Sequence, residues 1–122
     1  MLSTPTPLSE AQLRQVNTCI RLTPREQLAM RSAFAESLPA GAEVYLYGSR
    51  ADLSAAGGDI DLLIWVAGLD FNAELDLSAR LSAKLEQALG ERKIDLNFTN
   101  TLGPQAKPFV QLVLPRAVRL FP

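Results

Sequence analysis

Residues 44–65 read VYLYGSRADLSAAGGDIDLLIW, and this stretch decides the fold. Two apolar runs, residues 42–47 and 59–66, have the composition of β-strands, and they are joined by a loop of mostly small residues, 48–58. The second run is too apolar to have one whole face in solvent, so we expect it in the centre of a sheet. The segment therefore predicts two consecutive strands, with Gly48-Ser49 directly after the first.

The rest of the chain predicts helices around these strands. Thr23 followed by Pro24 and Glu26 is a typical helix start, and leucines recur with helical periodicity between residues 71 and 89. The expected order is a helix from Thr23 to about Ser37, the two strands, a helix over 71–89, a strand over 92–98, a short helix near 105–113 and an edge strand over 117–121. The fold class is α+β in two layers, a small mixed sheet with helices packed on one face.

The N-terminal residues stand apart from this pattern. Ser9 and Gln12 fit a capping box, which predicts a short helix to about Cys19, and the prolines within residues 1–8 indicate a loose start. We therefore expect residues 1–21 to be an N-terminal extension and residues 22–122 to form the domain.

Composition limits the classes of function. The 122 residues suffice for one domain, the formal net charge is −1, and the basic composition typical of a general nucleic-acid binder is absent. There is no histidine, which excludes His-based acid–base chemistry and His-ligated zinc, and the single cysteine excludes an intrachain disulfide. With no signal peptide and no apolar run of membrane-spanning length, we expect a cytoplasmic protein.

Two carboxylates begin the second strand. Asp59 and Asp61 are two residues apart, so their side chains share one face of a strand at a spacing of about 6.5–7 Å. Like charges this close repel each other unless a counterion is present. Because the ligands are oxygens without His or Cys, the pair favours Mg²⁺, Mn²⁺ or Ca²⁺ over zinc.

Asp95 offers a third carboxylate on the later strand, facing the same surface if the two strands are neighbours. Three carboxylates of this kind can bridge two cations for in-line phosphoryl displacement. The turn at Gly48-Ser49 can direct backbone N–H groups and a hydroxyl toward an anion, and Arg50 can add charge. Each motif alone has an ordinary interpretation as well: a solvated strand start, a surface aspartate, a common turn and a solvent-exposed arginine.

Taken in order, these motifs resemble the minimal nucleotidyltransferases of the DNA polymerase beta-like superfamily. That family has Gly-Ser, a loop of around ten residues, Asp-x-Asp and a third Asp on a later strand, and the resemblance covers roughly residues 22–121. It implies that Gly48 and Ser49 contact the triphosphate. It also implies that Asp59 and Asp61 ligate two Mg²⁺ ions, with Mn²⁺ as a possible substitute, and that Asp95 ligates one ion and helps to deprotonate the attacking hydroxyl.

The resemblance further implies a reaction and a partner. We expect transfer of a nucleoside monophosphate, AMP from ATP, to a hydroxyl. Because 122 residues leave little room for an acceptor-binding domain, we expect the acceptor to be a protein. Similar proteins pair with helical HEPN ribonuclease toxins, which they neutralise as antitoxins. We expect no direct binding of nucleic acid or membrane.

Two other interpretations stay open. The loop of this family often carries several arginines and a serine before the first aspartate, whereas here it is Ala-rich and Gly58 precedes Asp59. That departure favours a binding module that keeps its carboxylates but neutralises a partner by occlusion. The third interpretation is a small acidic domain in which the motif match is accidental.

Overall fold

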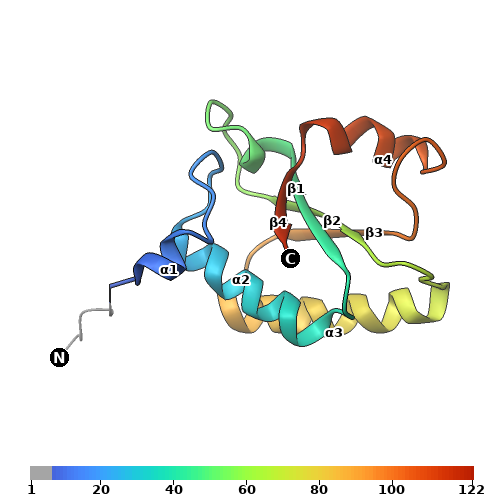
Figure 1. Cartoon of the computed structure of the whole chain (residues 1–122), viewed down its shortest axis with the longest axis horizontal. Helices are drawn as coiled ribbons and strands as arrows, with labels where there is room; N and C mark the ends of the chain where they lie inside the picture. Colours follow the sequence, from blue (N-terminus) through green and yellow to red (C-terminus); the bar gives the residue numbers. More distant parts are fainter. Residues whose placement is uncertain (1–6) are drawn as a thin grey trace.

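The computed structural model describes residues 7–122 (Figure 1). Its elements, in chain order, are α1 (Glu10–Leu13), α2 (Pro24–Ser37), β1 (Glu43–Tyr47), the 3-10 turn η1 (Gly48–Ala51), β2 (Ile60–Trp65), α3 (Phe71–Leu89), β3 (Ile94–Thr99), α4 (Pro108–Val113), the 3-10 turn η2 (Leu114–Arg116) and β4 (Val118–Phe121). The expected loose start at residues 1–8 lies mostly outside the described residues.

The four strands form one mixed sheet in the order β3-β2-β1-β4. β1 is antiparallel to both of its neighbours, whereas β2 and β3 are parallel because α3 connects them as a crossover. The predicted α+β fold with a small mixed sheet is confirmed, and β2, the most apolar strand, is one of the two central strands.

Local sequence signals set the ends of the long helices. The Thr23 hydroxyl accepts from the N–H of Glu26, and the Glu26 carboxylate accepts from the N–H of Thr23, which closes the predicted capping box. The Asp70 side chain caps α3 by accepting from the N–H of Ala73, and Gly90 ends α3 with a positive φ of 78°.

The main core lies between one face of the sheet and the two long helices, which run below it in Figure 1. β2 alternates so that Ile60, Leu62 and Ile64 are all fully buried on this face. The helices contribute the buried side chains Met30, Phe34, Leu77, Leu81 and Leu85. Because the odd-numbered residues of β2 point away from this core, Asp61 lies on the other face of the sheet.

The opposite face is partly covered by α4, which lies above the strands in Figure 1. There Leu63 of β2 packs with Ala106 and with Val110 of α4 in a second, smaller apolar cluster. The prediction that helices pack on one face therefore holds for α2 and α3 and is wrong for α4. Leu63 lies on the aspartate face of β2 and is fully buried because α4 covers it. The helical periodicity of the sequence did not indicate which face of the sheet this short helix would cover.

The N-terminal helix is shorter than predicted: α1 ends at Leu13 and does not continue to about Cys19. The buried amide of Gln27 explains the difference: its oxygen accepts from the N–H of Asn17 at 2.7 Å, and its nitrogen donates to the carbonyls of Asn17 and Leu22 at 2.8 and 3.0 Å. These bonds tie residues 17–22 to α2 as an irregular segment. Ile20 and Leu22 are buried in the main core, so the segment is part of the packed domain.

Within residues 7–122, every helix is too short or too polar to cross a membrane.

Candidate active site

Three polar side chains form a row across the sheet on the face that carries α4. In the parallel pairing of β2 with β3, Asp61 stands opposite Asp95, and in the antiparallel pairing of β2 with β1, it stands opposite Tyr47. The backbone N–H of Ile60 donates to the carbonyl of Lys93 at 3.1 Å, which fixes the parallel register at its start. The structure thus brings together two of the three predicted carboxylates.

The electrostatics of Asp61 reflect this crowding. Burial raises the pKa of the Asp61 carboxyl, and a hydrogen bond with Asp95 and the negative charges of Asp95 and Asp59 raise it further, while the charge of Lys93 opposes them. Asp95 is exposed at the edge strand, whereas Asp61 is partly buried. A positive ligand between these carboxylates would relieve their repulsion.

Asp59 lies just before β2 and has a different partner. Its Oδ2 is 3.5 Å from Nζ of Lys93, in an ion pair whose side chains are 50% and 70% exposed. Within the part of the chain that the structure describes, no three Asp, Glu, Cys or His side chains are gathered closely enough to hold a metal ion. The arrangement is therefore a close pair, Asp61 with Asp95, and a third carboxylate that is engaged by a lysine.

Gly48 adjoins this pair at the end of β1. It has a φ of +76°, a conformation that suits glycine, and a Cβ atom placed on it would overlap Oδ2 of Asp61. Ser49 is packed in the same way, because a Cβ atom on Gly57 would lie 2.8 Å from its Oγ. A side chain at Gly48 would displace the Asp61 carboxylate, and a side chain at Gly57 would displace the Ser49 hydroxyl.

Arg50 makes contacts that the sequence did not predict. Its two terminal nitrogens donate to the carbonyls of Arg21 and Gly58 at 2.8 and 3.1 Å. In return, the N–H of Arg21 donates to the carbonyl of Arg50 at 2.8 Å, and the Arg21 side chain donates to the carbonyls of Ser49 and Gly57 at 3.4 and 2.9 Å. The structure thus uses Arg50 to join the loop to the N-terminal segment.

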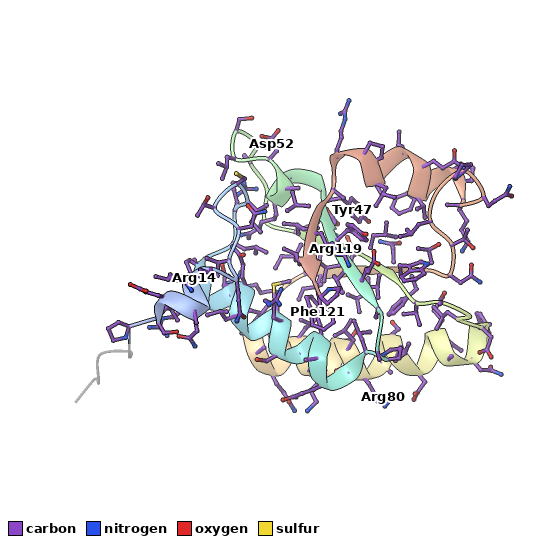
Figure 2. All side chains as sticks on the ribbon, in the orientation of Figure 1. Arg14, Tyr47, Asp52, Arg80, Arg119 and Phe121 are labelled. Carbon is purple, nitrogen blue, oxygen red and sulfur yellow. The ribbon has the colours of Figure 1, made fainter. Side chains whose placement is uncertain are left out.

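Tyr47 stands beside Asp61 on the aspartate face and also packs against the second apolar cluster. Its hydroxyl accepts from the side-chain nitrogen of Asn97 at 2.7 Å, and its ring meets that of Phe109 edge to face at 5.6 Å, beneath α4 (Figure 2). Burial and the charges of Asp61 and Asp95 raise the pKa of Tyr47 to about 12, so it stays a neutral phenol near neutral pH. The alternation of β3 places Asn97 on the same face as Asp95. This pattern was the one sequence feature from which the contact between Asn97 and Tyr47 could have been predicted.

A hollow of about 640 Å³ opens beside Gly48 and Ser49. Cys19 of the N-terminal segment, Leu53 of the loop and Arg116 of η2 also line it. Asp52, labelled in Figure 2 on the loop after β1, also lines the hollow and accepts from the N–H and the hydroxyl of Ser54 at 2.9 and 2.7 Å. Another hollow, of about 530 Å³ between α3 and β3, contains none of the predicted site residues.

A comparison of the sequence with the models of known protein families finds no match, and a search of curated proteins finds no significant relative.

Proposed function

We propose that this chain is a nucleotidyltransferase that moves a nucleoside monophosphate, AMP from ATP, to a hydroxyl group. The observation that carries the proposal is the pairing of Asp61 with Asp95 across β2 and β3, with Gly48 shaped to accept the Asp61 carboxylate. The family resemblance of the motifs gives the reaction class, and the geometry supports it by placing the motifs on one face of the sheet.

The donor set fits a hard divalent cation in its chemistry. The raised pKa of Asp61, caused by burial and by its acidic neighbours, is the mark of carboxylates held together against their repulsion. Asp61 and Asp95 would hold Mg²⁺ or Mn²⁺, and Asp59 would join them by exchanging Lys93 for the ion. When bound, the ion neutralises charge on the phosphoryl oxygens.

The protein's own groups have distinct tasks in this scheme. Gly48 and Ser49 contact the phosphates, and Asp95, the exposed carboxylate, takes the proton of the attacking hydroxyl. The hydroxyl oxygen forms a bond to the α-phosphorus while the bond to the bridging oxygen of the β-phosphate breaks, and pyrophosphate leaves. Tyr47 lies beside the pair as a neutral group, so it adds no charge to a site that binds anions.

The acceptor in this proposal is a hydroxyl on a partner protein, a HEPN-type ribonuclease toxin, in the cytoplasm. Residues 7–122 are organised around a single sheet, and a partner would supply its own acceptor surface. Phe109 and Leu112 of α4, near the site, are 42% and 75% exposed and offer an apolar surface for such a partner. Transfer of AMP would neutralise the toxin, which makes the chain an antitoxin.

The test is transfer of label to a HEPN-type protein encoded beside this chain. Label should move from ATP carrying the isotope at the α-phosphate and not from ATP carrying it at the γ-phosphate. The double variant Asp59→Asn, Asp61→Asn should lose transfer and keep its circular dichroism spectrum, and Glu91→Gln, an exposed carboxylate outside the site, should keep transfer. Transfer that persists in the double variant would refute the mechanism.

A binding module without catalysis is the second candidate. Two observations favour it: the described carboxylates do not gather into a three-ligand group, and Arg50, the arginine of the loop, is occupied by backbone carbonyls. Such a module would neutralise the partner by covering it. Calorimetry separates the candidates, because an enzyme binds Mg-ATP with measurable heat, whereas a pure binding module binds the partner and gives no heat with Mg-ATP.

A further inference from the structure

The sheet places Arg116 beside the Gly-Ser turn. β1 and β4 are antiparallel, with Leu46 opposite Val118. Gly48 follows Leu46 by two residues, just after β1, and Arg116 precedes Val118 by two residues, just before β4. The antiparallel pairing therefore brings both residues to the same end of the sheet. Consistent with this, Arg116 lines the 640 Å³ hollow together with Gly48 and Ser49.

Arg116 is also the basic residue in the lining of this hollow. Its side chain is exposed and forms no ion pair or hydrogen bond with the described residues. Arg50 and Arg21 both donate to carbonyls of the loop and its neighbours, and Arg119, on the following strand, pairs with Glu43 at 3.4 Å. An arginine fork left free at the rim of a hollow is suited to phosphate oxygens.

The lining of the hollow also contains one carboxylate, Asp52, which is bonded to Ser54. The bonds from Ser54 to Asp52 stabilise its charged form, and they lower the pKa of that carboxyl. The volume of about 640 Å³ lies within the range of small-ligand sites, roughly 300–1,000 Å³.

We propose that this hollow binds a polyphosphate chain, the β- and γ-phosphates of the nucleotide, and that Arg116 is the cation that binds it. This inference rests on the proposed function, because the ligand is the phosphate tail of the nucleotide that the proposed transferase would use. Ser49 borders the tail on one side and Arg116 on the other. Arg116 thereby takes the role that the sequence suggested for Arg50.

The first experiment measures binding of inorganic tripolyphosphate by calorimetry, without metal and at low salt. Arg116→Gln should weaken binding by about tenfold or more, the usual effect of losing a charge-assisted hydrogen bond. Arg116→Lys should fall between the two, because a point charge replaces the fork. The matched control is Arg80→Gln, an exposed arginine on α3 at the far side of the sheet, which should bind like the wild type (Figure 2).

The second experiment locates the ligand with the protein's own thiol. Cys19 is the sole cysteine of the sequence, and it is exposed and lines the same hollow. Tripolyphosphate should slow its alkylation by iodoacetamide at least severalfold in the wild type and in Arg80→Gln. In Arg116→Gln the same slowing should need about ten times more tripolyphosphate, with rates compared within each variant.

The outcomes separate this inference from the proposed function. If Arg116→Gln binds tripolyphosphate like the wild type, or if bound tripolyphosphate leaves Cys19 alkylation unchanged, the inference is wrong even where label transfer is observed. If binding depends on Arg116 and Cys19 is protected, the inference stands, and an absence of label transfer then counts against the transferase alone.

Discussion

The carboxylate of Asp61 occupies the space in which a side chain on Gly48 would begin. Gly48 begins the 3-10 turn that directly follows β1, and Asp61 lies on the neighbouring β2, where it pairs with Tyr47, the last residue of β1. The turn that would meet phosphate and the carboxylate that would hold a cation are therefore one packed unit.

Gly48→Ala tests this unit. Alanine at a φ of +76° costs about 1–2 kcal/mol of stability, and its Cβ also displaces the Asp61 carboxylate, so Mg-ATP affinity should fall about tenfold or more. Gly68→Ala is the matched control: its φ is +69°, but nothing lies within 4 Å of the added Cβ. Urea unfolding should show similar losses for both variants, while calorimetry should show weaker Mg-ATP binding for Gly48→Ala alone. Equal affinities would contradict the coupling.

Asp61→Asn should stabilise the protein while it abolishes transfer. The pKa of Asp61 is raised in the folded state, so folding is penalised above that raised pKa, and the penalty disappears as the pH falls below the ordinary value near 3.8. At pH 7 the variant should gain a few tenths to about 1 kcal/mol in free energy of unfolding. Glu91→Gln should show no such gain. Urea titrations at pH 7 and near pH 3 measure the difference, and a loss of stability at pH 7 would oppose this account.

Lys93→Gln should increase the affinity for Mn²⁺. Lys93 pairs with Asp59, and removing the lysine frees that carboxylate to bind a cation. Because an exposed ion pair contributes about 0.2–1 kcal/mol, the affinity for Mn²⁺ should rise severalfold at most. Lys84→Gln breaks a comparable exposed pair, with Glu36 at 3.1 Å between α3 and α2, and should leave Mn²⁺ binding unchanged. Calorimetry with Mn²⁺ is the measurement. Weaker binding in Lys93→Gln would show that the lysine is not in competition with the ion.

Arg21→Gln should loosen the loop between β1 and β2. The variant loses the side-chain bonds to the carbonyls of Ser49 and Gly57, at a cost of about 0.5–1.5 kcal/mol each. Hydrogen exchange over residues 49–58 should accelerate, while exchange in the buried strand β2 changes little. Arg14→Gln, at the residue that directly follows α1, removes an exposed arginine from the same N-terminal segment and should have no such effect. Unchanged exchange in Arg21→Gln would mean that the loop holds its shape without this arginine.

The local features of this chain were predictable because each depends on neighbours in sequence. The capping box at Thr23 and the glycine end of α3 follow from residues three or four positions apart. The pairing of Asp61 with Asp95 was also within reach, since a helical crossover makes the two strands parallel and equal alternation puts both side chains on one face.

The features that were missed depend on contacts between distant segments. Arg50 looked like a free cation because its partner, the carbonyl of Arg21, lies in a segment interpreted as an extension. Tyr47 meets Asn97 and Phe109, which belong to two later elements of the chain. No local pattern encodes such contacts, so the sequence predicted the strands that carry the carboxylates but not the contacts made by Arg50 and Tyr47.

The hollow beside Gly48 takes its walls from Cys19, from the loop after β1 and from Arg116, near the two ends of the described chain. Because these segments are distant in the sequence, the hollow is complete only when both have folded onto the sheet. A nascent polypeptide that has not yet delivered β4 has no complete pocket there. Any ligand of this hollow therefore binds the finished fold and not its precursors, and by mass action it should protect the protein against heat in proportion to the logarithm of its concentration.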